Sequence, residues 1–143
     1  MTFCSLSVVN AKEIAEFFKE NFSDGWTESM IVSAFNTDRF CAIAAVEEEK
    51  TVGIITFSYA LDTADIEDVV VRKDMRKKGY GEKLLTAALD KISSDGMIKV
   101  MLEVREGNTP AISLYTKLGF SMLSVRKKYY SDGENALIMA REF

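Results

Sequence analysis

Apolar residues follow two different periods along the chain, and the order of these periods predicts the fold. Stretches with helical spacing or helix-start signals predict helices near 10–22, 26–35, 81–92 and 108–118. Runs rich in β-branched and aromatic residues predict strands near 3–9, 40–46, 51–59, 65–71, 97–104, 120–130 and 135–141. The resulting order, β-α-α-β-β-β-α-β-α-β-β, predicts an α/β fold in which helices cover both faces of one mixed sheet.

Polar residues at the ends of the helical stretches indicate where two of the helices begin. Asn10, with Glu13 three positions later, is typical of a helix N-cap. Asn108 precedes Pro110, which favours the first turn of a helix, and Gly119 suits the residue after the last turn. We therefore expect Asn10 and Asn108 to lie at helix starts.

Polar turns and a change of period locate features of the sheet. The turn at 47–50 predicts an antiparallel hairpin, and the Asp-Gly pair within 131–134 predicts a second one. The strand at 65–71 alternates at first and then becomes continuously apolar, as in a strand covered on both faces. The change occurs at Asp68-Val69, where we expect a β-bulge.

The totals fit one domain spanning residues 1–143, because 48% of the 143 residues are hydrophobic and 28% are charged. The net charge of -4 argues against a sequence-independent nucleic-acid binder. No apolar run reaches the ~18 residues of a membrane span, and the first residues lack the features of a signal peptide. We expect a cytoplasmic protein without a membrane or direct nucleic-acid partner.

The cysteine and histidine content narrows the possible chemistry. Cys4 and Cys41 stand alone in hydrophobic runs, so they predict buried strand residues rather than a disulfide framework or a zinc site. The chain has no histidine, which excludes Ser-His-Asp and Cys-His catalysis. Proton transfer must therefore depend on carboxylates, tyrosine, lysine, cysteine or water.

The hexapeptide Arg76–Gly81, RKKGYG, places three cations and two glycines between a predicted strand and a predicted helix. A helix N-terminus has unpaired N–H groups and a partial positive charge, so this loop could hold a phosphate. Glycine would let the backbone approach the anion, and Arg76, Lys77 and Lys78 would add charge-assisted hydrogen bonds. A solvated basic turn fits the six residues equally well. The spacing matches neither a P-loop nor a dinucleotide fingerprint, which needs glycine in place of Leu84.

Arg-x-x-Gly-x-Gly between a strand and a helix resembles the acetyl-coenzyme A (acetyl-CoA) pyrophosphate motif of the GNAT superfamily of N-acetyltransferases, whose fold has a similar element order. LEVREGNTPAISLYTKLGF at 102–120, and RKKYY followed by ALIM, resemble the bacterial ribosomal-protein alanine N-acetyltransferases. The resemblance covers nearly the whole chain and is strongest from about Asp65 onward. It implies the GNAT fold, acetyl-CoA as co-substrate, no metal, and acetyl transfer to the N-terminal amine of a peptide or protein, such as a ribosomal protein.

The resemblance also implies roles for individual residues. Glu103 would be the general base that takes a proton from the substrate ammonium, and Tyr115 the general acid that protonates the departing thiolate. Strand residues would bind the pantetheine and acetyl carbonyl, and the residues from Lys77 to Glu82 the pyrophosphate. The full cofactor site would comprise Val69, Val70, Val71, Arg76, Lys77, Lys78, Gly79, Tyr80, Gly81, Glu82 and Asn108.

Each of these roles has an alternative. Glu103 could be a charged strand residue that faces water, Tyr115 a core tyrosine on an apolar helical stripe, and Asn108 only an N-cap. Glu67, in IEDVVV, resembles the glutamate that handles the amine in acetyltransferases of polyamines and amino sugars. Two other functions therefore stay open: a small-amine acetyltransferase that uses Glu67, and a CoA-binding module without transfer activity.

Charge and proton affinity bear on the acceptor. The acidic residues around the first hairpin and the next strand either attract a cationic amine or basic peptide or simply face solvent. They are Glu47, Glu48, Glu49, Asp62, Asp65, Glu67 and Asp68. Proton transfer to a glutamate is uphill by ~5 kcal/mol from an α-amine and by ~8 kcal/mol from a lysine, given their ordinary pKa values. A site without histidine therefore suits an N-terminal amine better.

Overall fold

The computed structural model describes residues 1–22 and 26–143, and in this part of the chain seven strands form one sheet in the order β1-β2-β3-β4-β5-β7-β6. The strands are β1 (Thr2–Leu6), β2 (Phe40–Glu47), β3 (Lys50–Ala60), β4 (Thr63–Val71), β5 (Lys99–Arg105), β6 (Ser121–Arg126) and β7 (Ala136–Glu142). The helices are α1 (Ala11–Asn21), α2 (Glu28–Phe35), α3 (Tyr80–Ser94) and α4 (Thr109–Lys117), with 3-10 turns η1 (Val8–Asn10) and η2 (Lys73–Met75). Because β4 and β5 run parallel and the other neighbours antiparallel, the sheet is mixed. The predicted element order and fold class are confirmed.

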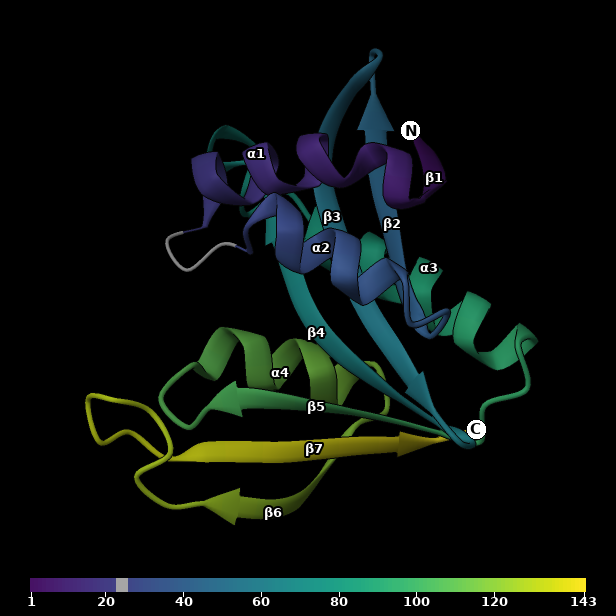
Figure 1. Ribbon diagram of the computed structural model, residues 1–143. Coiled ribbons are helices and arrows are strands. Elements are labelled where there is room, and N and C mark those ends of the chain that lie inside the picture. Colours follow the sequence, from purple (N-terminus) through teal and green to yellow (C-terminus); the bar gives the residue numbers. More distant parts are fainter. Residues whose placement is uncertain (23–25) are drawn as a thin grey trace.

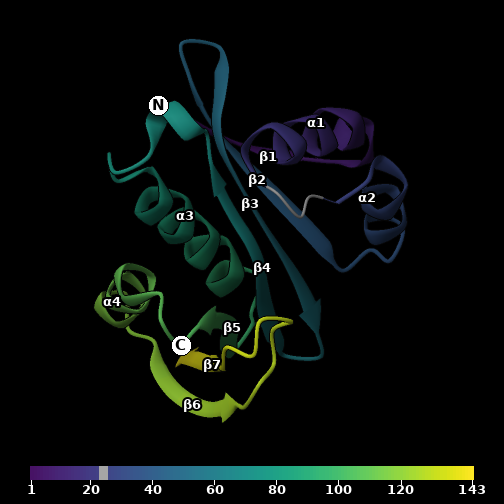
Figure 2. The same cartoon turned by 90° about the vertical axis from the view of Figure 1, so that its left-hand side faces the viewer.

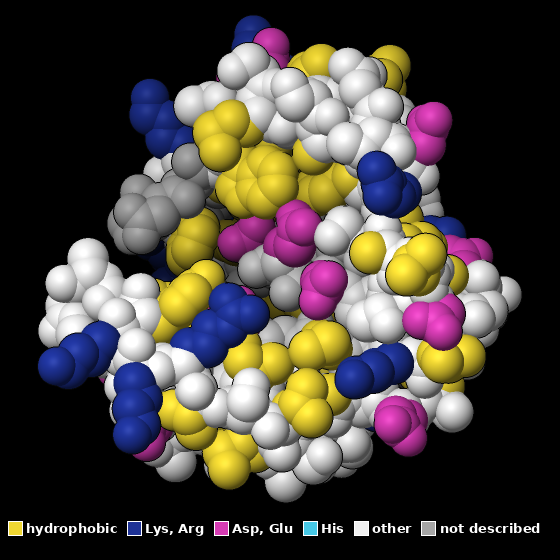
Figure 3. All heavy atoms as spheres, turned by 60° about the horizontal axis from the view of Figure 1, so that its bottom comes forward, with side chains coloured by type: hydrophobic (Ala, Val, Ile, Leu, Met, Phe, Trp, Pro, Cys, Tyr) yellow, Lys and Arg dark blue, Asp and Glu magenta, His cyan; other side chains and the backbone are white. Residues whose placement is uncertain are grey.

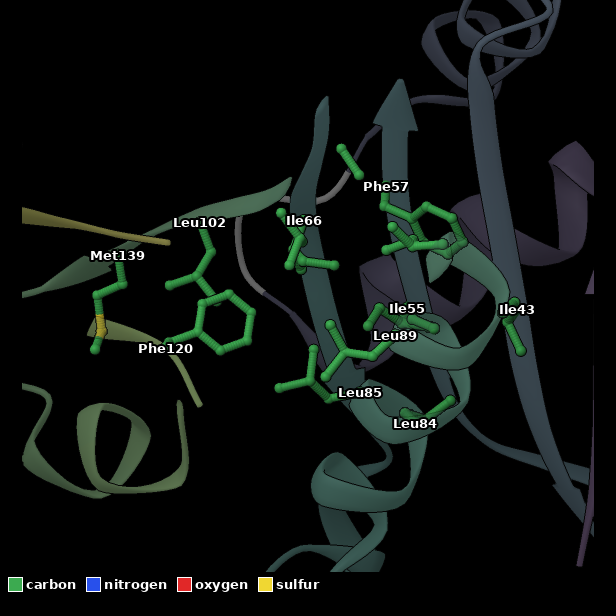
Figure 4. Packing of buried hydrophobic residues seen from close by; sticks show 14 of the residues in the cluster. Ile43, Ile55, Phe57, Ile66, Leu84, Leu85, Leu89, Leu102, Phe120 and Met139 are labelled. Atoms are coloured by element: carbon green, nitrogen blue, oxygen red, sulfur yellow. The ribbon is translucent and has the colours of Figure 1, made fainter. Parts of the chain in front are cut away.

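The helices cover both faces of the sheet, with α1 and α2 on one face and α3 and α4 on the other (Figures 1 and 2). A hydrophobic core lies on each face. On the α3 side, leucines of the helix point toward side chains of β3, as Figure 4 shows for Leu84, Leu85, Leu89, Ile55 and Phe57. The core under α1 and α2 includes Ile14, Phe18, Ile31 and Phe40. None of the described helices is long and apolar enough to cross a membrane.

The N-terminal strand is shorter than the sequence predicts. β1 ends at Leu6, and the next residues form η1 instead of continuing the strand. The backbone N–H of Ser7 donates to Oδ1 of Asn10 at 3.0 Å, which closes this turn. Asn10 is therefore the N-cap residue of α1 by position, but its side chain bonds the preceding turn and not a helix amide.

The prediction that both cysteines are buried is wrong for Cys4. Its strand, β1, is an edge of the sheet, and Cys4 is exposed there. Cys41, on β2, is half-buried against the core on the α3 side. The hydrophobic run around Cys4 predicts the strand correctly but not its edge position, which depends on strands far away in the sequence.

The C-terminal hairpin has a longer connection than the predicted Asp-Gly turn. β6 and β7 pair antiparallel, but β6 ends at Arg126 and β7 begins at Ala136. A guanidinium nitrogen of Arg105, at the end of β5, donates to carboxylates of Asp132 and Glu134 at 2.9 Å each. These ion pairs hold the connecting segment against β5, so the chain leaves the sheet after Arg126, earlier than predicted.

Strands β4 and β5 are neighbours over only a short length. Their parallel register runs from Thr63↔Lys99 to Asp65↔Met101, and beyond it the two strands diverge, as Figure 1 shows. β4 also contains the predicted bulge, one residue earlier than expected. Ile66 pairs with Phe57 and Asp68 pairs with Thr56 on β3, which leaves Glu67 as the extra residue. The divergence and the bulge together open the sheet on the side of α1 and α2.

Candidate active site

Residues 76–82 join η2 to the first turn of α3, and we call them the cradle loop. Lys77 and Gly79 have positive φ angles of 62° and 86°, and Gly79 precedes the first residue of the helix. Within the described residues, the backbone N–H groups from Lys77 to Glu82 donate to no protein acceptor. A helix N-terminus with free amides carries a partial positive charge and suits an anion.

The space in front of the cradle loop is open. A Cβ atom added at Gly79 or at Gly81 would meet no atom within 4 Å. Gly79 is required by its φ angle, whereas Gly81 is required by neither packing nor strain. Its missing side chain leaves room for a ligand to approach the amides, so the chemistry and shape of the loop fit the pyrophosphate of acetyl-CoA.

Several side chains predicted for the cofactor site face other parts of the protein. Nε of Arg76 donates to the carbonyl of Val71 at 3.1 Å, and its Nη2 donates to the carbonyl of Asn21 at 2.5 Å. The Tyr80 hydroxyl donates to the carboxylate of Glu47. These three bonds hold the loop in place.

The remaining loop side chains differ in what they contact. The carboxylate of Glu82 forms an ion pair of 2.8 Å with Lys117 on α4. Lys77 and Lys78 are exposed at the start of the loop. The groups that can face an anion are therefore the amides and these two lysines.

A cleft of about 600 Å³ lies where β4 and β5 diverge, and we call it the acidic cleft. Figure 3 shows acidic side chains gathered in this hollow, with apolar side chains above them and basic side chains at the lower rim. Its lining comprises Trp26, Ser58, Asp65, Ile66, Glu67, Asp68, Met101, Leu102, Glu103, Arg126 and Ile138. Both candidate bases, Glu67 and Glu103, are in this set, on opposite sides of the divergence.

Strand periodicity brings these carboxylates to one face. On β5, Leu102 and Val104 are buried on the α3 and α4 side, so Glu103 between them faces the cleft. Glu103 is two residues past Met101, the last residue of β5 that pairs with β4. Glu67 occupies the matching position on β4, two residues past Asp65. The two glutamates are therefore the first charged residues that line the cleft after the strands diverge.

Burial makes the carboxyl groups on β4 weaker acids. It raises the pKa of Glu67 above the ordinary range, although the Ser58 hydroxyl, which donates to Glu67 at 2.8 Å, acts in the opposite direction. Burial also raises the pKa of Asp68, which accepts a bond of 3.3 Å from the Thr56 hydroxyl. The pKa of Asp65 is raised by burial first and by the charge of Glu103 second. These three carboxyl groups therefore keep their protons to a higher pH than exposed carboxyl groups do.

Glu103 has a different environment from Glu67. It is exposed, and Oε1 lies 3.4 Å from Nη1 of Arg126 on β6. Arg126 contacts Glu103, and Ser58 contacts Glu67. Neither contact could be predicted from one sequence, because each joins residues on different strands.

Tyr115 and Asn108 lie outside the acidic cleft. Tyr115, on α4, packs into the core on the opposite face of the sheet from Glu103, with its ring 5.9 Å from that of Phe120. Burial raises the pKa of Tyr115, so its hydroxyl stays protonated at neutral pH. Oδ1 of Asn108 accepts from the N–H of Ala111 at 3.3 Å, which confirms the predicted N-cap.

One buried polar residue was not predicted from the sequence at all. Asn21, the last residue of α1, is only 5% exposed. Its Oδ1 accepts from the backbone N–H of Lys73 at 3.0 Å, so α1 is bonded to the segment that precedes the cradle loop. From the sequence alone, an asparagine near a helix end suggests a solvated residue. Its contact with Lys73 is evident only once η2 is placed in space.

Comparison with known proteins gives one consistent picture. Residues 11–120 match the model of the acetyltransferase (GNAT) family. The chain is 34% identical over 106 residues to the ribosomal protein bS18-alanine N-acetyltransferase of Haemophilus ducreyi, covering 71% of this chain and 73% of that one. It is 42% identical over 77 residues to an N-alpha-acetyltransferase of Saccharolobus solfataricus, covering 53% of this chain and 46% of that one.

A solved structure agrees with these sequence relatives. The ribosomal-protein-S18-alanine N-acetyltransferase of Escherichia coli superposes with a TM-score of 0.90 at 28% identity. The alignment covers 99% of this chain and 92% of that one. The similarity therefore extends over all of the sheet and both helical layers.

Proposed function

This chain belongs to the GNAT family of acetyltransferases, and on that premise we propose that it acetylates the N-terminal α-amine of a protein, with a ribosomal protein as the substrate. As an N-acetyltransferase, it takes its acetyl group from acetyl-CoA. The observation that carries the choice of acceptor is the agreement among relatives, which are named for ribosomal protein bS18 alanine or for N-alpha acetylation. The acidic cleft fits an amine acceptor in general, because the amine arrives as a cation.

The cradle loop would hold the acetyl donor by its pyrophosphate. The supporting features are the free amides of Lys77 to Glu82, the open space at Gly79 and Gly81, and the two exposed lysines. Val69 and Val70 pair with β3, and their other edge lies where β5 has moved away. Their backbone groups on that edge would bind the pantetheine arm. Asn108, whose side chain caps α4, would contact the donor from the opposite side.

Glu103 would act as the general base on the acceptor ammonium. It faces the acidic cleft beside the divergence of the strands, and its ion pair with Arg126 orients the carboxylate. Once the proton has gone, the amine nitrogen has the free lone pair that the reaction needs. A positioned base contributes about 10²–10⁴-fold to such a step. Glu67 faces the same cleft and is the competing candidate.

Tyr115 would supply the proton at the end of the reaction. Bound acetyl-CoA supplies a thioester, in which a new C–N bond to the amine replaces the C–S bond to the sulfur. As the amide forms, the nitrogen releases its second proton to water, and the sulfur leaves as a thiolate that needs a proton. The buried hydroxyl of Tyr115 retains its proton at neutral pH and lies on the α4 face of the sheet, opposite Glu103. The two proton transfers would thus occur on the two faces of the sheet.

The acceptor class is tested by comparing substrates in one assay of free thiol release from acetyl-CoA. We expect turnover with a peptide that begins with alanine and little with spermidine or an amino sugar. The control is the same peptide with its α-amine already acetylated, which leaves only side-chain amines. Faster turnover of spermidine than of the alanine peptide would replace the proposed acceptor with a small amine. Mass spectrometry of protein N-termini in cells with and without the enzyme would then identify the natural acceptor.

A further inference from the structure

A buried asparagine joins the helix layer on the acceptor side to the loop on the donor side. Nδ2 of Asn21 donates to the carbonyl of Phe17 at 2.9 Å within α1, and Oδ1 accepts from the N–H of Lys73 at 3.0 Å. The amide side chain, 5% exposed, therefore has partners for both of its ends. Figure 1 shows the segment before α3 passing beside the end of α1. This contact fixes the backbone four residues before Lys77.

Arg76 crosses the same junction in the other direction. Its Nη2 donates to the carbonyl of Asn21, at the C-terminal end of α1, and its Nε donates to the carbonyl of Val71, the last residue of β4. A helix C-terminus carries partial negative charge, which strengthens a bond from a guanidinium. The rigid, planar guanidinium can bond two carbonyls at once, and an ammonium group cannot reproduce that geometry. Arg76 thus connects α1, β4 and the start of the cradle loop.

We propose that Arg76 is a positioning residue for acetyl-CoA and not a ligand of its phosphates, and that with Asn21 it fixes the loop whose amides bind the pyrophosphate. The proposal rests on the proposed function in one respect, namely that acetyl-CoA binds at the cradle loop. The two bonds of Arg76 occupy the nitrogens that point to the backbone of Asn21 and Val71. Charge toward the ligand comes instead from the exposed Lys77 and Lys78.

The conformation of the cradle loop explains why it needs this support. Lys77 has a φ angle of 62°, which costs energy for a residue with a side chain, and Gly79 has one of 86°. Such conformations persist only where the surrounding structure holds them. The junction formed by Asn21, Lys73 and Arg76 ends directly before Lys77. Without it, the amides would lose the preformed arrangement that an anion requires, and binding would have to supply the ordering.

Binding of acetyl-CoA by calorimetry separates positioning from direct charge. We expect Arg76→Lys to raise the dissociation constant on the order of tenfold although it keeps the positive charge. Asn21→Ala should also raise it, although within the described residues its side-chain hydrogen bonds are to Phe17 and Lys73 and not to the loop itself. Neither effect should shrink at about 1 M salt, where the screening length is about 3 Å. The loss in Lys78→Ala should be smaller and should shrink at high salt.

Arg72→Ala is the matched control. Arg72 is a neighbouring arginine whose side chain pairs with the exposed Asp74, with Nε and Oδ1 2.6 Å apart. Its replacement removes one guanidinium beside the loop, as a change at Arg76 does. Because Arg72 pairs with the exposed Asp74 and not with α1, its loss should change the dissociation constant by less than about twofold. At saturating acetyl-CoA, Arg76→Lys should keep most of its kcat, because the affected step is binding. A uniform loss of kcat with an unchanged dissociation constant would contradict the proposal.

Amide hydrogen exchange tests the same idea without a ligand. We expect the hydrogen-bonded amides on either side of the loop, those of Lys73 and Lys83, to exchange faster in Arg76→Lys than in the unmodified protein, and at an unchanged rate in Lys78→Ala. Wild-type affinity in both Arg76→Lys and Asn21→Ala, with unchanged exchange, would overturn the positioning role. A failure of the unmodified protein to bind acetyl-CoA would instead overturn the proposed function, and the exchange rates would still report on the junction. Melting temperatures identify any variant that is unfolded. If Asn21→Ala is unfolded, the result for Arg76→Lys, the milder change, decides the test.

Discussion

In the cradle loop, the groups that face the open space are backbone N–H groups, whereas in the acidic cleft they are carboxylate side chains. The amides of the loop come from a strand, a glycine-bearing turn and a helix that are consecutive in the sequence, and the contacts of Arg76 with Asn21 hold that turn in place. The cleft needs side chains from β3, β4, β5 and β6 to meet, which depends on strand order, register and a bulge. The donor site therefore depends on side chains only through the backbone that they hold in place, whereas the acceptor site depends on them directly.

The same contrast separates the two halves of the reaction. The donor would be held by groups whose charge does not change with pH, since amides do not titrate. The acceptor would be bound among carboxyl groups with pKa values that burial has raised, so their charge depends on pH. In the cradle loop the damaging change should therefore be added bulk at Gly81, and in the cleft it should be the isosteric loss of the one carboxylate that accepts the proton.

The largest expected effect is in the acidic cleft. Glu103→Gln should lower kcat by about 10²–10⁴-fold at neutral pH, because it removes the group that accepts the proton. Its residual rate should rise as the pH approaches about 8, where an α-amine loses its proton without help. The measurement is steady-state release of thiol with an alanine-starting peptide across pH.

Two isosteric variants serve as controls for Glu103→Gln. Glu67→Gln removes the competing carboxylate, and Asp65→Asn removes a cleft carboxylate for which no proton transfer is proposed. We expect both to retain kcat within about tenfold of the unmodified enzyme. If Glu67→Gln instead loses more activity than Glu103→Gln, the base is Glu67, and the small-amine function becomes the better supported one.

A second large effect is expected on the opposite face of the sheet. Tyr115→Phe should lower kcat by about 10²-fold and leave the dissociation constant of acetyl-CoA nearly unchanged, because only the hydroxyl is removed. The aromatic ring and its packing against Phe120 are retained, so stability should change little. Stopped-flow or steady-state thiol release gives kcat, and calorimetry gives the dissociation constant. Undiminished turnover would make Tyr115 a core residue only.

The cradle loop should respond to added bulk more than to lost charge. Gly81→Val should weaken acetyl-CoA binding by at least about tenfold, because its side chain would occupy the open space in front of the amides. Gly81→Ala should have a smaller effect in the same direction, and Lys78→Ala the smallest. Thr86→Val, on the exposed side of the same helix, controls for added apolar surface. A larger loss in Lys78→Ala than in Gly81→Val would mean that side-chain charge dominates this site.

Local signals explain which parts of the fold and the site could be predicted from the sequence. Helix starts, the hairpin at 47–50 and the strand–loop–helix unit around Gly79 depend on neighbours a few residues away, and the structure places each of them close to its predicted position. The phase change in β4 is also local, and it identifies the bulge to within one residue of Glu67. The same holds for Asn108, whose cap bond reaches only three residues ahead.

What the sequence could not predict depends on contacts between distant segments. The exposure of Cys4 follows from the edge position of β1, and the early end of β6 follows from the ion pairs of Arg105. Arg76 belongs to a cationic run that suggested an anion ligand, and its bonds to the Val71 and Asn21 carbonyls appear only once α1 and β4 are placed in space. A charged residue can be read as a candidate ligand from sequence, but its partner cannot.

The smallest expected effect concerns stability, and it sharpens the contrast between titrating and non-titrating sites. Because burial raises the pKa of Asp68 in the folded state, the folded protein binds this proton more tightly than the unfolded chain does. Its contribution to the free energy of unfolding is therefore favourable below the ordinary aspartate pKa and is lost as the pH rises through the raised pKa. Asp68→Asn should thus raise the melting temperature slightly at pH 7 and leave it nearly unchanged at about pH 3, because asparagine retains the acceptor for Thr56. Thermal unfolding at the two pH values measures this difference, with Asp90→Asn, an exposed position on α3, as the control. If the variant is less stable than the unmodified protein at pH 7, the charge of Asp68 stabilises the fold. The carboxylates of the cleft would then not destabilise the protein, and in this respect the cleft would not differ from the cradle loop.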